Sequence, residues 1–210
     1  SETRLPEVPS AIIETLSHQN FPDMALGQDP NVKFTLARSM YKTIVRYVNS
    51  MHGRSTIIAP LAPRNVSVEL TAKNQVQLSW SAQPDEQEPT ATPTYYIIYT
   101  ATGHGGFDNG TKVNGTSAVM TIEPGETYHF RVTAANRGGE SFPSETVSAF
   151  SCPNARKTIL VINGFHRLAT PAVVDNNYRQ GFDIDRDPGV SYGLTAGWNG
   201  RQQCFDVSRM

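Results

Sequence analysis

The sequence predicts a mainly β protein organised around an antiparallel β-sandwich, and three observations predict this fold class. The first is strict alternation downstream of a Pro124–Gly125 turn, where Tyr128, Phe130, Val132 and Ala134 would share one face. The second is similar alternation in residues 66–70 and 76–80. The third is a composition with 16 Gly and 14 Pro, together with frequent Thr, Ser and Asn, which is typical of turn-rich β proteins.

Composition limits the classes of function. The chain has 210 residues, enough for one large or two small domains. Charged residues make up 18% of the chain and the net charge is −1, so we expect no nucleic-acid partner. No apolar run reaches the ~18 residues of a membrane span, and residues 1–20 show no signal-peptide pattern.

The two cysteines, Cys152 and Cys204, make neither a disulfide framework nor a metal-site spacing. The pattern favours two separate thiols, and a single bridge between them remains the alternative.

Residues 1–57 predict a strand, a loop and a long helix. Pro9–Glu14 is typical of a short apolar strand ending on a carboxylate, and Thr15–Asp29 of a loop. Asp29 is expected to cap the helix and Pro30 to be its first residue, with Gly53 closing its end. Apolar residues repeat along one helix face at Val32, Leu36, Met40, Ile44 and Val48, flanked by Phe34, Tyr41, Val45 and Met51.

Residues 58–152 predict the sandwich, after a Pro-punctuated linker at 58–63. Trp80 is expected to face the core with Val76 and Leu78, and its alternative role is an exposed ring that stacks on sugar. Inward positions are also predicted for Tyr96 and Ile98 of a strand at Tyr95–Thr100. Further strands are expected at Val66–Leu70, Thr111–Val113, Ser117–Ile122 and Glu145–Cys152, the last with Val147 and Phe150 in the core. The glycine-dense stretch 102–110 is expected to be a hairpin turn, because it lacks the ending of a phosphate loop.

Residues Ile122–Asn136, followed by Gly138, Ser141, Pro143 and Ser144, resemble the E–F corner, F strand and F–G loop of a fibronectin type III domain. A tyrosine just after such a corner can bury its ring and bond its hydroxyl to the upstream backbone, which is the role expected of Tyr128. Arg137–Gly139 is not an Arg-Gly-Asp motif, so adhesion of the animal type is not predicted.

The first 57 residues carry a second resemblance. Ile12–Thr15, Gln19–Asp23 and the helix resemble the C-terminal end of zinc-dependent N-acetylmuramoyl-L-alanine amidases over roughly 45 residues. Asn20 and Asp23 match that family at their spacings. Gln19 stands where serine is usual, and Thr43 stands near the usual glycine of the helix.

The resemblance implies that Glu14 is the catalytic glutamate, which moves a proton or stabilises charge beside a zinc-activated water. The alternative for Glu14 is a surface carboxylate at a strand end. The family's zinc ligands come from earlier segments, and the histidines here form no metal-like cluster: His18, His52, His104, His129 and His166. We therefore expect no cofactor and no metal in this chain, and zinc only in an intact parent protein.

The last segment begins with a continuous apolar run, Lys157–Phe165, that predicts a strand buried on both faces and ended by Gly164. It resembles the opening of the α/β domain of xanthan lyase-like and golvesin-like bacterial proteins, where an aspartate is common at the position of His166. Asp183–Asp187 could suggest a calcium loop, but Pro188 and Leu194 occupy positions that need Gly and Glu, which favours solvated loop acids.

These observations predict three parts: residues 1–57, the end of an amidase-like domain; residues 58–152, a whole type III domain; and residues 153–210, the start of an α/β or β-rich domain. The expected function is a piece of a secreted bacterial hydrolase acting on cell wall or polysaccharide, with this chain mainly a spacer or interaction module. The expected location is extracellular, periplasmic or at the cell surface, and the expected partner is peptidoglycan or another polysaccharide. The alternative is a non-enzymatic module that binds carbohydrate or protein.

Overall fold

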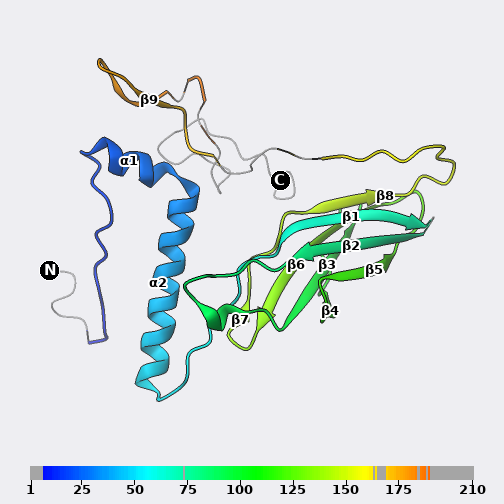
Figure 1. Ribbon diagram of the computed structural model, residues 1–210, viewed down its shortest axis with the longest axis horizontal. Coiled ribbons are helices and arrows are strands. Elements are labelled where there is room, and N and C mark those ends of the chain that lie inside the picture. The colour runs from blue at the N-terminus through cyan, green and yellow to red at the C-terminus, as the bar shows by residue number, and fades with distance from the viewer. Residues whose placement is uncertain are drawn as a thin grey trace. The chain divides into compact units, whose positions relative to one another are not determined.

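The structure is a computed structural model that describes residues 7–72, 74–162, 164, 169–183, 185–187 and 189. The chain divides into two compact units. One contains residues 42–160, and the other contains the described residues before 42 and after 160. Figure 1 labels most of their helices and strands.

Hydrogen bonds from the flanking residues satisfy unpaired backbone groups at the ends of the two helices. Helix α1 (Phe21–Gln28) begins after Asn20, whose side chain accepts a hydrogen bond from the N–H of Asp23. Helix α2 (Pro30–Met51) begins after Asp29, whose carboxylate accepts from the N–H of Asn31 at 2.8 Å. The expected cap at Asp29 and start at Pro30 are therefore confirmed, whereas α1 lies in a segment that was predicted to be loop.

Gly53 ends α2 as predicted. Its φ of 63° is the left-handed conformation that glycine adopts without a steric penalty. The N–H groups of Gly53 and Arg54 donate to the carbonyls of Ser50 and Asn49, which is the hydrogen-bond pattern of a Schellman cap.

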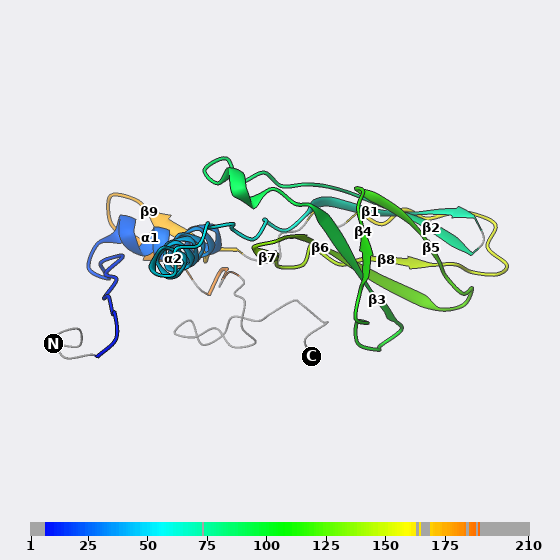
Figure 2. The same cartoon turned by 90° about the horizontal axis from the view of Figure 1, so that it is seen from below.

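The unit of residues 42–160 contains a sandwich of two antiparallel sheets (Figures 1 and 2). One sheet has the order β1-β2-β5, with β1 at Arg64–Ala72, β2 at Gln75–Ser81 and β5 at Ser117–Thr121. The other has the order β4-β3-β6-β7, with β8 also paired to β6. Its strands are β3 (Tyr95–Thr102), β4 (Thr111–Val113), β6 (Thr127–Asn136), β7 (Gly139–Glu140) and β8 (Val147–Phe150), and a short 3-10 helix, η1 (Pro89–Ala91), precedes β3. The mainly β, antiparallel fold class is confirmed.

Alternation places the core between the two sheets, as predicted. The buried cluster contains Val76, Leu78, Trp80, Tyr96, Ile98, Ile122, Phe130, Val132, Ala134 and Ala149. Trp80 and Tyr96 pack edge to face with their ring centres 5.5 Å apart. Trp80 is therefore a core residue, and the alternative of an exposed sugar-stacking ring is wrong.

The tyrosine corner is also confirmed. The hydroxyl of Tyr128 accepts a hydrogen bond from the N–H of Glu123 at 3.2 Å, across the turn that contains Gly125. The hydroxyl thereby satisfies a backbone donor at the point where the chain crosses from one sheet to the other.

The chain that leads into the sandwich is packed into its end. Ile58 is fully buried, although residues 58–63 were predicted to be a linker. The side-chain amide of Asn136 donates to the carbonyls of Ile58 at 2.9 Å and Thr90 at 3.0 Å. Gly138 lies so close to the Ile57 carbonyl that a Cβ atom there would overlap it. Residues 57–60 are therefore part of the domain.

Two predicted features of the sandwich region and its approach differ from the structure. Residues 9–14 are irregular and exposed, because a strand needs a hydrogen-bonded neighbour and no described segment pairs with them. Phe150 was predicted to lie in the core but is 49% exposed, whereas Ala149 is buried. Strand side chains alternate with a period of two, so a strand that turns Val147 inward also turns Ala149 inward and Phe150 outward.

The segment after the sandwich also departs from the prediction. Residues 157–162 form no strand and expose Ile159, Leu160, Val161 and Ile162 by 77–85%. A strand buried on both faces needs neighbours on both sides, and the described residues supply none. A hairpin that was not predicted follows, with β9 (Val173–Asp175) paired to β10 (Gln180–Phe182) around an Asn176 side chain that accepts from the N–H groups of Tyr178 and Arg179.

Candidate functional site

Glu14, the predicted catalytic residue, lies exposed in the irregular segment before α1. Among the residues that the structure describes, no three His, Cys, Asp or Glu side chains gather where they could hold a metal ion. Glu14 is thus an exposed carboxylate, and its catalytic role stays a prediction.

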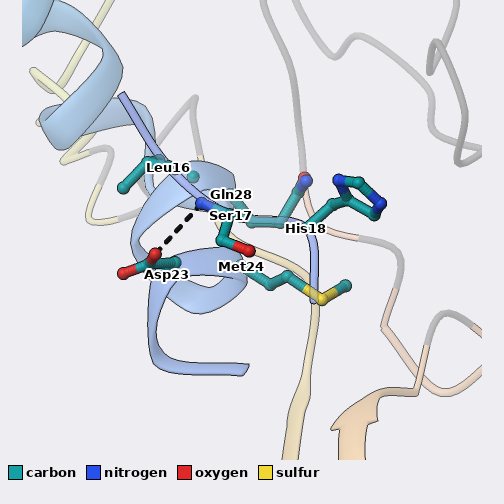
Figure 3. A pocket seen from close by; sticks show the side chains of 7 residues that line it. Leu16, Ser17, His18, Asp23, Met24 and Gln28 are labelled. Carbon is teal, nitrogen blue, oxygen red and sulfur yellow. Dashed lines mark hydrogen bonds between the residues drawn. The ribbon is translucent and has the colours of Figure 1, made fainter. Parts of the chain in front are cut away.

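A surface hollow of about 380 Å³ lies beside α1 and is drawn in Figure 3. It is lined by Leu16, Ser17, His18, Asp23, Met24, Gly27 and Gln28. The N–H of Ser17 donates to the Asp23 carboxylate at 3.0 Å, which is the dashed line in Figure 3. Asp23 and Asn20, which match the amidase pattern, thus both have local roles around the start of α1.

A row of aromatic and charged side chains covers the outer face of the sheet that contains β3 and β6. The guanidinium of Arg131 lies over the ring of Phe107, 4.0 Å from its centre, and also faces the ring of Tyr99 at 5.4 Å. The ammonium of Lys112 lies 4.0 Å from the centre of the Tyr95 ring. The cationic groups of this face therefore pack on the flat sides of its rings.

Glu140 fixes one end of this row. Its carboxylate accepts hydrogen bonds from the hydroxyls of Tyr99 at 2.7 Å and Thr133 at 2.6 Å. The hydrogen bond to Glu140, and then burial, raise the pKa of Tyr99 above its usual value of 10.0. Burial alone raises the pKa of Tyr96, whose ring lies in the core. Both phenols therefore stay neutral well beyond neutral pH.

The last turns of α2 carry two ion pairs to the loop between β2 and β3, within the unit of residues 42–160. The ammonium of Lys42 lies 2.7 Å from the Asp85 carboxylate, and both side chains are largely buried. Arg46 pairs with Glu88, which is buried and also accepts from the Thr90 hydroxyl at 2.7 Å. The Thr90 hydroxyl in turn accepts from the N–H of Ile58. A connected polar network therefore joins the helix, the loop and the start of the domain.

Sequence reasoning missed this network because Arg46 and Glu88 are 42 positions apart, and Ile58 and Thr90 are 32 positions apart. The signal that could have indicated it is the unusual placement of Lys42 and Arg46, four positions apart on one helix face, before a loop rich in Asp and Glu.

Other predicted residues have simpler roles. Cys152 is an exposed free thiol, and Cys204 lies outside the described residues. The carboxylates of Asp183 and Asp187 accept from the N–H groups of Arg186 and Gly189, as capping groups of a turn do. His166, Pro188 and Leu194 lie outside the described residues. No helix in the described part of the chain is long and apolar enough to cross a membrane.

Comparison with known proteins identifies one family in this chain. The model of the fibronectin type III domain matches residues 61–150. Two human relatives are 31% identical, receptor-type tyrosine-protein phosphatase H over 107 residues and myomesin-2 over 115 residues. Each match spans 51% of this chain but only 9% and 7% of those proteins, respectively.

Solved structures give likenesses of low overall score. The twitchin kinase region of C. elegans is 26% identical with a TM-score of 0.41, covering 48% of this chain and 18% of that one. The third fibronectin III domain of the human KIAA0343 protein is 18% identical with a TM-score of 0.40, covering 50% of this chain and 94% of that one.

Proposed function

We propose, from the premise that residues 61–150 form a fibronectin type III domain, that this chain is a spacer and interaction module against which the last turns of α2, residues 42–51, are docked. The observation that carries the proposal is the ion-paired joint between α2 and the sandwich, formed by Lys42 with Asp85 and by Arg46 with Glu88. Both ion pairs lie within the unit of residues 42–160, and they hold these turns of the helix against the loop between β2 and β3.

The energetics of the joint fit this role. Glu88 is 5% exposed, and a buried carboxylate is strongly destabilising without its counter-charge. Separating the last turns of α2 from the loop would leave Glu88 uncompensated. Arg46 itself is half-exposed, whereas Lys42 and Asp85 are both largely buried, so the Lys42–Asp85 pair is the one better shielded from water.

Hydrogen exchange at the backbone amides of residues 43–51 tests the joint. Most of the stability of a helix in a protein comes from tertiary packing, so protection in these turns depends on docking. Arg46→Ala should lower the protection of these amides by at least tenfold, while Lys33→Ala, which removes an exposed lysine from the same helix, should leave it unchanged. Equal protection in the Arg46→Ala protein, or an equal loss in the Lys33→Ala protein, would contradict the docking of residues 43–51.

A finer proposal concerns the protein to which this module would belong. The match of Asn20 and Asp23 to the amidase pattern, at the family's spacings, favours a secreted bacterial hydrolase of peptidoglycan or another polysaccharide, located outside the cell or in the periplasm. Zinc would then be held by residues of the intact parent, with Glu14 beside it.

A muropeptide-release assay separates this finer proposal from the spacer function. This chain should release nothing, and a zinc-loaded parent should be active. Removing a group aimed at developing charge commonly costs ~10²–10³ in rate, so Glu14→Gln in the parent should be slowed by that factor. Wild-type activity of the Glu14→Gln parent would leave Glu14 as a surface carboxylate without affecting the spacer proposal.

A further inference from the structure

The outer strands of the sandwich are protected to different degrees against pairing with another chain. Unpaired edges are commonly blocked by bulges, charges, shortness or a covering segment. Strand β1 has two irregularities of register and carries Glu69 and Arg64. Strand β1 lies beside β8, so each of these two strands shields the edge of the other. Strand β4 has only three residues and carries Lys112.

Strand β5 has none of these devices. It runs Ser-Ala-Val-Met-Thr from Ser117 to Thr121, without a charge, a proline or an irregularity of register against β2. It forms the outer strand of the β1-β2-β5 sheet, as Figure 1 shows, and Val119 at its centre is 57% exposed. An uncharged strand edge of this kind is a template for a further strand.

The hydrogen bonds to β2 define which groups of β5 are free. The backbone N–H of Trp80 donates to the carbonyl of Thr116, and the backbone N–H of Ile122 donates to the carbonyl of Asn74. In an antiparallel ladder, every second residue bonds to the same neighbour, so Ala118 and Met120 also turn their N–H and C=O groups toward β2. The backbone groups of Ser117, Val119 and Thr121 therefore point away from β2, and no described residue bonds to them.

We propose that two copies of this chain associate through their β5 edges, antiparallel and centred on Val119. In this register Val119 faces Val119 of the partner subunit, and Ser117 faces the partner's Thr121. These are the three residues with free backbone groups, so all of them meet as hydrogen-bonded pairs. The two sheets then become one continuous six-stranded sheet.

The side chains of β5 suit this register because the strand is nearly palindromic in character. Hydroxyl side chains stand opposite each other at both ends, β-branched valines meet on the two-fold axis, and Ala118 stands opposite the larger Met120 of the facing strand. β-branched pairs across two strands are favourable, and no like charges meet. A second copy therefore fits the edge better than an arbitrary peptide would.

The association is closed and weak. The contact is isologous, because the same β5 edge of each copy is paired. Neither copy then has a free β5 edge for a third chain, so the contact yields dimers rather than fibres. A five-residue strand pair buries less than a standard interface, so we expect a Kd between about 10 µM and about 1 mM.

Sedimentation velocity of the full chain, from about 10 µM to about 1 mM, tests the proposal. The wild-type protein should dimerise with increasing concentration, and Val119→Lys should weaken the association more than tenfold by placing two ammonium groups on the axis. Val119→Thr keeps the branched side chain and should still dimerise. Ile159→Lys adds the same charge at a residue that is 85% exposed off this edge and should change nothing. A monomer at 1 mM, or equal weakening by Ile159→Lys, would overturn the proposal.

Cross-linking tests the register in a background with Cys152→Ser and Cys204→Ser. Residues of a hydrogen-bonded antiparallel pair have Cα atoms about 5.5 Å apart, within the range that a disulfide can span. Val119→Cys should therefore give covalent dimers on mild oxidation. Ser117→Cys should not, because Ser117 faces the partner's Thr121 and its own copy lies about four strand positions away. Equal cross-linking of the two variants would contradict the register.

Discussion

Strand β3 of the sandwich and residues 159–162 both carry apolar side chains, yet these side chains lie in opposite environments. In β3, Tyr96 and Ile98 are buried while their neighbours face outward. In Ile159–Ile162 all four side chains are more than three-quarters exposed. The difference teaches that an apolar run becomes a buried strand only where neighbouring strands satisfy its backbone and cover its faces.

Among substitutions that test this comparison, we expect the largest loss of stability at Trp80. Trp80→Ala removes the largest ring of the core and should cost about 3–5 kcal/mol of unfolding free energy. Urea denaturation followed by circular dichroism measures the loss. Because whole domains are stable by only ~5–15 kcal/mol, a lowered melting temperature should also be obvious. An unchanged melting temperature would contradict the position of Trp80 in the core.

The next effect tests whether the chain before β1 belongs to the domain. The amide of Asn136 contacts the carbonyls of Ile58, Thr90 and Thr92, and its oxygen accepts from the N–H of Gly138. Asn136→Ala leaves buried carbonyls without a donor and should cost about 1–3 kcal/mol, measured by the same denaturation. Asn109→Ala, at an exposed turn position, is the matched control and should cost little. Equal costs would place the boundary of the domain after residue 60.

A smaller effect is expected at the corner. Tyr128→Phe keeps the ring and removes only the hydroxyl bonded to the N–H of Glu123, so it should cost about 0.5–1.5 kcal/mol. Tyr178→Phe, at a residue that is 99% exposed, provides the control. If Tyr128→Phe destabilised the domain as much as Tyr128→Ala, the hydroxyl rather than ring burial would carry the effect and the corner would need another explanation.

The sequence predicts the sandwich well because its signals are local. Alternation in β2, β3 and β6, the Pro124–Gly125 turn and the caps of α2 can each be recognised within about ten residues. The prediction for Phe150 is wrong because this residue lies three positions after Val147. Side chains of a strand return to the same face every two residues, so Val147 and Phe150 face opposite sides. Helix α1 was missed because Asn20, Pro22 and Asp23 are typical of turns as well as of helix starts.

The candidate site was much less predictable. The ion pairs of Lys42 and Arg46 join the helix to a loop about 40 positions later, and no local pattern encodes that contact. The amidase pattern predicted a strand at residues 9–14, but strand formation depends on a neighbour that the pattern does not contain. The free edge of β5 likewise becomes visible only when the order of strands in the sheet is known.

The smallest expected effect returns to the segment after the sandwich and uses one substitution at two places. Leu78→Ala, at a fully buried position, should cost about 2–5 kcal/mol, whereas Leu160→Ala, at a residue that is 77% exposed, should stay within about 0.5 kcal/mol of the wild type. Both variants lose the same atoms, so the difference between them measures what surrounding strands contribute to burial. The measurement is denaturant unfolding of the full chain. A loss at Leu160 close to that at Leu78 would show that residues 159–162 are covered in solution, and the contrast between these two regions would then be wrong.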